Sequence, residues 1–72
     1  MIKKNKIKIK VNGKIRAVKS NYSINDLIIE LNIPIKKVAI ELNKKILDKK
    51  KIRSVFLKTK DEVEIVHFIG GG

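Results

Sequence analysis

The chain has 72 residues, of which 43% are apolar, with no cysteine and a single histidine. A chain this short forms one domain, and such a domain buries only about 60% of its unfolded surface, which leaves no room for a deep substrate cavity. An ordinary pocket enzyme, a disulfide framework, a thiolate zinc site and a His-rich metal site are therefore all disfavoured. The cysteine count fits a reducing compartment.

The formal net charge of +11 has two explanations. Lysine, isoleucine and asparagine together make up half of the chain, which is the composition expected from a coding sequence poor in G and C. An RNA partner would explain the same basicity. The charge is unevenly placed, however, because residues 61–72 sum to −3 whereas residues 1–20 sum to +8. An acidic end has no evident use in a nucleic-acid binder but suits docking to a basic protein.

The amino end predicts a β-hairpin. Apolar residues alternate with lysines, which indicates a strand rather than an amphipathic targeting helix, at Ile7, Ile9 and Val11. Asn12-Gly13 then favours a tight turn. We expect a three-residue loop through Lys14, since it pairs apolar residues across the strands, Val11 with Ile15 and Ile9 with Ala17.

A short amphipathic helix is expected next. Ser23 is the predicted N-cap, and Asp26 three residues later completes a weak capping box. The helix presents one apolar stripe to a sheet, formed by Ile24, Leu27, Ile28 and Leu31. Asn32 and Pro34 end it.

Alternation of apolar and polar residues returns at 38–42 and predicts a third strand. Asn43-Lys44 indicates a turn, residues 45–47 a short strand, and residues 48–54 a loop or a single helical turn. Asp61 opens a last strand at 62–69. This order predicts an α+β fold in which one helix packs across a small mixed sheet. No apolar run approaches the about 18 residues that span a bilayer, so no membrane segment is expected.

The last strand is apolar on both faces. One face carries Val63, Ile65, His67 and Ile69, and the other carries Val66 and Phe68. Because one helix can cover only one face, we expect an exposed partner-binding patch, formed by Phe68, Val66, Ala39 and Leu47. In the alternative interpretation Phe68 folds over a sheet edge or packs on residues 48–54.

The sequence finishes with Gly70-Gly71-Gly72. Such a run is compatible with a frayed terminus. It is not a phosphate-binding loop, because no helix and no Lys-Ser/Thr pair follow it. Without Cβ atoms, however, a glycine run can also thread through a narrow tunnel, which leaves the α-carboxylate as its only reactive group.

Three segments resemble the sulfur carrier proteins of thiamine biosynthesis, the ThiS family, which are ubiquitin-like β-grasp proteins. They are Val38–Asn43, Ile46-Leu47 and, most specifically, Asp61–Gly72. The resemblance covers the whole chain in length and element order, and its last third at the level of residues. It implies a single β-grasp domain over residues 1–69 and a flexible glycine tail over residues 70–72.

The resemblance also implies a chemistry. An E1-like adenylyltransferase would use ATP to adenylate the carboxylate of Gly72, with Gly71 as its functional neighbour and Gly70 extending the thread. Sulfur from a cysteine desulfurase relay would then give a thiocarboxylate, and thiazole synthase would receive it. The carrier itself would be no enzyme and would hold no cofactor or metal, in the cytoplasm or inside an organelle. The absence of cysteine agrees, because no side chain can carry a persulfide.

Other polar residues near the tail have weaker cases. His67 is expected to be packed or hydrogen-bonded rather than chemically active. The acidic residues Asp61, Glu62 and Glu64 fit either contacts with basic residues of the adenylyltransferase or a solvated cluster.

Two alternatives remain open. The nearest is another Gly-Gly carrier, for molybdopterin synthesis or tRNA thiolation, although molybdopterin carriers typically have prolines before the glycines and the one proline here is Pro34. The other is a small RNA-binding β-grasp module, suggested by the +15 carried by residues 1–20 and 43–60. The chain is poor in the aromatic residues that stack on bases, with only Tyr22, Phe56 and Phe68, and no nucleic-acid partner is expected.

Overall fold

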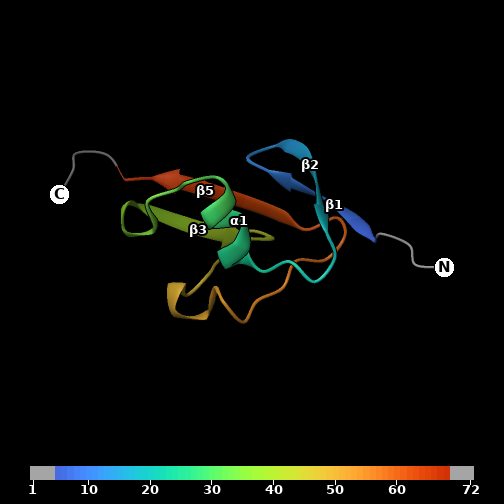
Figure 1. Cartoon of the computed structure of the whole chain (residues 1–72). Coiled ribbons are helices and arrows are strands. Elements are labelled where there is room, and N and C mark those ends of the chain that lie inside the picture. The colour runs from blue at the N-terminus through green and yellow to red at the C-terminus, as the bar shows by residue number, and fades with distance from the viewer. Residues whose placement is uncertain (1–4, 69–72) are drawn as a thin grey trace.

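The computed structural model describes residues 5–68, which form one five-stranded sheet and one short α-helix. The elements follow in the order β1 (Lys6–Val11), β2 (Lys14–Lys19), α1 (Ile24–Glu30), the 3-10 turn η1 (Ile35–Lys37), β3 (Val38–Leu42), β4 (Lys45–Ile46), the 3-10 turn η2 (Lys49–Lys51) and β5 (Glu62–His67). The strands lie side by side in the order β2-β1-β5-β3-β4, so the last strand in sequence is central in the sheet (Figure 1). The predicted α+β class is confirmed.

The turn between β1 and β2 contains only Asn12 and Gly13, so the predicted three-residue loop is wrong. The backbone has φ 50° at Asn12 and φ 83° at Gly13, the two positive values that a type I′ turn requires. The expected cross-strand pairs are replaced by Val11 with Lys14 and Ile9 with Arg16. The turn chemistry therefore sets the register, and apolar pairing does not.

This register exchanges the two faces of β2. Val18 enters the core, whereas Ile15 is 69% exposed and Ala17 is exposed as well. Arg16 takes the inward-facing position opposite Ile9 at this side of the sheet. Its guanidinium Nη2 donates to the Glu30 carboxylate on α1 at 2.8 Å, which gives the charged side chain a partner there.

Helix α1 begins at the predicted capping box. The Ser23 hydroxyl accepts from the Asp26 N–H at 3.0 Å, and the Asp26 carboxylate accepts from the Ser23 N–H at 2.9 Å. The helix ends at its C-cap Leu31, and Asn32 adopts φ 56° directly afterwards. Both predicted boundaries are confirmed.

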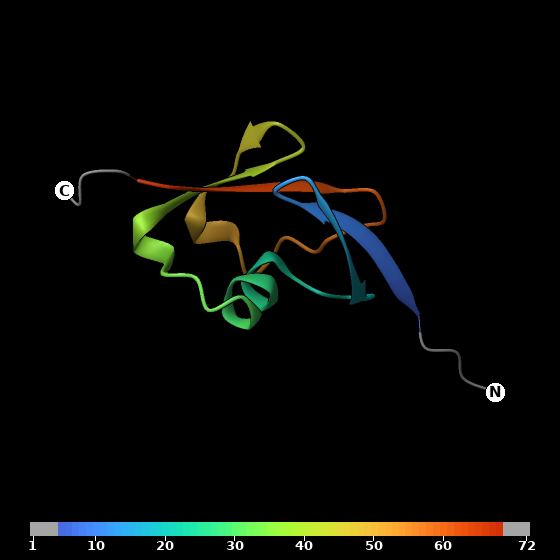
Figure 2. The same cartoon turned by 90° about the horizontal axis from the view of Figure 1, so that it is seen from above.

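The core lies between α1 and one face of the sheet. Figure 2 shows α1, η1 and η2 on the same side of β5. The predicted stripe of α1 is confirmed, since Ile24, Leu27 and Ile28 are buried and Leu31 is partly buried. The largest fully buried side chains are those of Ile9, Ile24, Leu27, Val38, Ile40 and Val63. Within residues 5–68, no second helix covers the other face of the sheet.

The second hairpin repeats the turn chemistry of the first. Asn43 and Lys44 have φ 53° and φ 70°, and they form the predicted turn between β3 and β4. Strand β4 ends at Ile46, one residue before the predicted end at Leu47. The segment 48–54 contains the single turn η2, which Asp48 caps by accepting from the Lys50 N–H at 2.9 Å.

Strand β5 connects the two hairpins. It runs parallel to β1 and antiparallel to β3, which completes the expected β-grasp arrangement. The strand ends at His67. The next residue, Phe68, donates its backbone N–H to the carbonyl of Lys37, the last residue of η1, at 2.9 Å. The predicted last strand residue, Ile69, lies outside the described residues.

Candidate partner-binding surface

The face of the sheet opposite α1 carries an exposed apolar surface. Val66 on β5 lies directly opposite Ala39 on β3 in the antiparallel register. Their chain neighbours Ile40 and Ile65 are buried, so the alternation of the strands turns Val66 and Ala39 away from the core. Val66 is 53% exposed and Ala39 is half-buried. The structure brings these two predicted residues together as expected.

Leu47 does not join this surface, and that prediction is wrong. Leu47 is half-buried and packs against the core. Its neighbour Ile46 is 71% exposed and lies opposite Glu41, which shares the outward alternation of Ala39. Ile46 therefore replaces Leu47, and we call Ala39, Ile46 and Val66 the outer-face patch. The signal that could have found Ile46 is the two-residue turn at Asn43-Lys44, which fixes its pairing with Glu41.

Phe68 combines features of both interpretations. The residue is 56% exposed, as a docking residue should be. The ammonium of Lys49, in the segment 48–54, lies 5.2 Å from the ring centroid, which is within cation–π range. Phe68 is therefore exposed at the end of β5 and in contact with η2 at the same time.

Acidic side chains adjoin the outer-face patch. Glu41 on β3 and Glu64 on β5 lie directly opposite one another, and both carboxylates alternate outward with the patch. Like charges at directly opposite positions repel each other. A basic side chain on a partner would relieve that repulsion, so this pair gives the surface a preference for basic partners.

Asp61 is held in hydrogen bonds within the fold. Its carboxylate accepts from the Lys58 N–H at 2.8 Å and from the Asn43 side-chain amide at 3.0 Å. The Asn43 side-chain oxygen in turn accepts from the Glu62 N–H at 2.9 Å. These bonds tie the start of β5 to the β3–β4 turn, so Asp61 stabilises the strand rather than presenting a free charge.

His67 is exposed at the end of β5, opposite Val38, and its side chain makes no hydrogen bond within residues 5–68. The expectation that it is packed or hydrogen-bonded is therefore wrong. Among residues 5–68, no three His, Cys, Asp or Glu side chains gather closely enough to hold a metal ion. No helix in that part of the chain has the length and apolar character needed to cross a membrane. Tyr22 is buried, so its ring is not available for stacking on a base.

The glycines predicted to carry the chemistry, Gly70, Gly71 and Gly72, lie outside the described residues. The surface that the structure does describe, consisting of the outer-face patch, Phe68 and the Glu41–Glu64 pair, surrounds the strand that leads to them. Geometry thus supports a docking surface beside β5, and the role of the glycines remains a prediction.

Some known relatives are about as long as this chain, and others are much longer. A sulfur carrier protein ThiS from Bacillus subtilis is 38% identical over 89% of this chain and 98% of its own length. A thiazole synthase from Magnetococcus marinus is 35% identical over 92% of this chain, which spans only 20% of that longer protein. An uncharacterized protein ycf40 from Porphyra purpurea is 33% identical over the full length of both chains.

Structural and family comparisons agree with these relatives. The crystal structure of a thiamine biosynthesis protein, ThiS, from Geobacter metallireducens superposes with a TM-score of 0.78, at 29% identity, over 92% of this chain and 100% of that one. The ThiS family model matches residues 9–72 and so includes the strand β5 and the glycines that follow. The chain therefore belongs to the ThiS family.

Proposed function

We propose that the chain is a sulfur carrier protein of thiamine biosynthesis that carries sulfur as a thiocarboxylate on Gly72. The observation that supports this most strongly is the match of the family model as far as Gly72, together with a sulfur carrier relative covered over 98% of its length. The chain has no cysteine, so a carrier role for it requires a sulfur site other than a thiol.

The proposed chemistry belongs to the α-carboxylate of Gly72. This carboxylate attacks the α-phosphorus of ATP bound in the partner enzyme, which forms an acyl-adenylate and releases pyrophosphate. Adenylation makes the carbonyl carbon electrophilic, so the outer sulfur of a persulfide on the relay can displace AMP and form an acyl disulfide. A thiol then reduces the S–S bond, which releases the thiocarboxylate and leaves the sulfur donor in a new disulfide. Gly71 and Gly70 supply a stretch without side chains, which lets the backbone approach a nucleotide closely. In this scheme the chain is substrate and carrier, and the catalytic groups belong to the partners.

Three partners follow from this scheme. An E1-like adenylyltransferase docks on the outer-face patch and Phe68, with basic side chains opposite Glu41 and Glu64. A cysteine desulfurase relay supplies the sulfur. Thiazole synthase receives it, and this partner is supported by the thiazole synthases that contain a stretch similar to this chain within a longer sequence. ATP enters bound to the adenylyltransferase, and the site of action is the cytoplasm or the interior of an organelle.

The test is reconstitution of thiazole formation with the three partners, cysteine, ATP, a thiol reductant and the carbon and nitrogen substrates of thiazole synthase. The full chain should support formation of the thiazole phosphate. A chain that lacks Gly71 and Gly72 should support none. Its terminal carboxylate belongs to Gly70, two residues too early in the chain to reach the ATP. Thiazole formation at an undiminished rate by the shortened chain would refute the carrier role.

A further inference from the structure

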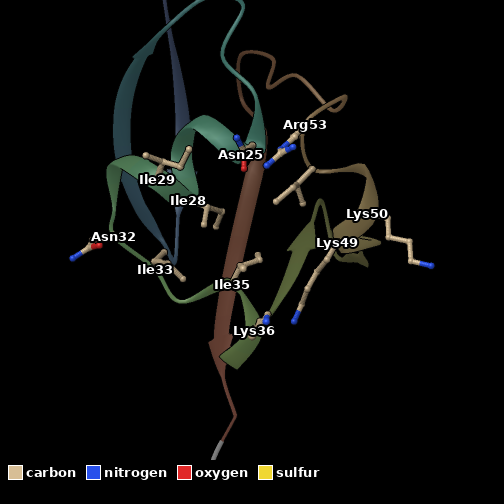
Figure 3. Close-up of a pocket in the computed structure, with 11 residues that line it drawn as sticks. Asn25, Ile28, Ile29, Asn32, Ile33, Ile35, Lys36, Lys49, Lys50 and Arg53 are labelled. Atoms are coloured by element: carbon tan, nitrogen blue, oxygen red, sulfur yellow. The ribbon is translucent and has the colours of Figure 1, made fainter.

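A second candidate surface lies on the helix side of the sheet, away from the outer-face patch. A groove of about 870 Å³ opens between α1, η1 and the segment that contains η2 (Figure 3). Figure 3 shows side chains from all three elements around the groove. We call it the basic groove.

The floor and one wall of the basic groove are apolar. They are formed by five isoleucines, Ile28, Ile29, Ile33, Ile35 and Ile52. Ile28 and Ile52 are buried, Ile33 and Ile35 are half-buried, and Ile29 is 68% exposed. Helix α1 has only seven residues, so it is too short to cover the isoleucines beside it. Burying this surface against a partner would be favourable, at about 25 cal/mol per Å² of apolar area.

The rim of the basic groove is cationic. Lys36 on η1 and Lys49, Lys50 and Arg53 on the other side line it, and no Asp or Glu is among its lining residues. In Figure 3, Arg53 extends toward α1 and Lys49 extends toward η1, whereas Lys50 points outward. The single ion pair among residues 5–68 joins Arg16 to Glu30, so no described carboxylate forms an ion pair with a rim cation. Isoleucines lined by four cations, none of them in an ion pair, favour a ligand that is both apolar and anionic.

We propose that the basic groove binds an acidic amphipathic segment of a partner protein. Apolar side chains of the segment pack on Ile28, Ile33 and Ile35, and its carboxylates face Lys36, Lys49 and Arg53. The groove and the outer-face patch lie on opposite sides of the sheet, so one partner can occupy each at the same time. Lys49 also contacts the Phe68 ring, so the bound segment lies next to the end of β5.

The composition of the groove favours a peptide over a nucleic acid or a membrane. Its lining contains no aromatic residue, whereas single-stranded nucleic acids are held largely by stacking on aromatic rings. Its concave shape suits a segment that enters between elements, whereas a membrane surface binds a convex or planar amphipathic face. A peptide helix with apolar residues at i, i+3, i+4 and i+7 presents the matching stripe.

The proposal can be tested without any sulfur chemistry, so its failure is distinguishable from failure of the carrier role. The probe is a fluorescein-labelled synthetic peptide with leucines at i, i+3, i+4 and i+7 and glutamates elsewhere, titrated in fluorescence anisotropy at about 0.15 M salt. Lys49→Glu with Arg53→Glu should weaken binding about tenfold or more. The matched control is Lys6→Glu with Lys19→Glu, an exposed cross-strand pair on the first hairpin, which should change affinity less than about twofold.

The apolar contacts of the groove are tested with a second variant and its matched control. Ile29 and Ile15 are exposed to the same extent, at 68% and 69%, so neither substitution by serine removes a core residue. Ile29→Ser should weaken peptide binding about threefold or more, and Ile15→Ser should leave it unchanged. Circular dichroism of each variant checks the fold.

Several outcomes would overturn the proposal. They are absence of peptide binding, equal loss in the groove and control variants, and undiminished binding when the leucines of the peptide are replaced by serine. A labelled oligouridylate or anionic vesicles that lose affinity on the groove substitutions, while the peptide does not, would assign the groove to nucleic acid or lipid instead.

Discussion

The side-chain amide of Asn12 is hydrogen-bonded to the backbone of Ile65, 53 residues away in sequence. The Asn12 oxygen accepts from the Ile65 N–H at 2.7 Å, and its amide nitrogen lies 3.4 Å from the Ile65 carbonyl oxygen. Strand β1 ends at Val11, so its backbone makes no further bonds to β5 beyond the turn. The Asn12 side chain takes the place of the backbone and extends the hydrogen bonding between β1 and β5 to Ile65. One residue thus supplies the positive φ of the turn and anchors the central strand.

Asn12→Gly should therefore lower the free energy of unfolding by about 1 to 3 kcal/mol, because it leaves the buried N–H of Ile65 without its partner. Glycine keeps the turn, since it adopts φ 50° freely. Urea denaturation followed by circular dichroism measures the difference. The control is Asn21→Gly, at φ 63°, where the side chain makes no hydrogen bond within residues 5–68. An equal loss in both variants would assign the effect to backbone entropy instead.

Tyr22 connects the start of α1 to its last turn. Its hydroxyl donates to the Glu30 carboxylate, which also accepts from Arg16. Burial, which is the largest cause, and the hydrogen bond to Glu30 together raise the pKa of Tyr22 to about 12. The same bond, followed by the bond from Arg16, lowers the pKa of Glu30.

These shifts predict an alkaline loss of stability. A tyrosine whose pKa is 10.0 in the unfolded chain and about 12 in the folded one binds more protons when folded, so its contribution is complete below pH 10 and is lost between pH 10 and 12. The stability difference between the wild type and Tyr22→Phe should shrink over that interval. Lysine titration is common to both proteins and cancels. Parallel stability curves from pH 9 to 12 would contradict the shift.

Phe68→Ala should weaken docking to the adenylyltransferase by about 1 to 3 kcal/mol, the effect typical of an exposed interface aromatic. Isothermal titration calorimetry of the two purified proteins measures this change. Phe56→Ala is the matched control, since Phe56 is 46% exposed and pairs with Ser23 at the start of α1, away from β5. Equal affinities for the wild type and Phe68→Ala, with the fold intact, would remove Phe68 from the interface.

Local sequence signals predicted most of the fold. The capping box at Ser23 and the two Asn-containing turns are short-range chemistry, so the residues that form them also determine them. Alternation predicted β3 and the buried face of β5 for the same reason. The predicted register of β2 is wrong because the type I′ turn, and not apolar pairing, sets it. Arg16 also has a partner, Glu30, that the strand sequence does not reveal.

Surface features proved harder to predict. Strand β4 has two residues, too few for alternation to assign its faces, and Leu47 was predicted where Ile46 lies. The basic groove could not be predicted at all, since its cations and isoleucines belong to three segments whose approach depends on the whole fold. The contact between Lys49 and Phe68 could not be predicted either, because it also joins two segments that only the whole fold brings together.

The most direct test of the carrier role is an intact mass spectrum of the chain after incubation with the adenylyltransferase, ATP, a cysteine desulfurase and cysteine. We expect a mass gain equal to one exchange of oxygen for sulfur, which fragmentation locates at Gly72 and which is absent without ATP. An unchanged mass with active partner enzymes, or a sulfur atom located at any other residue, would contradict it.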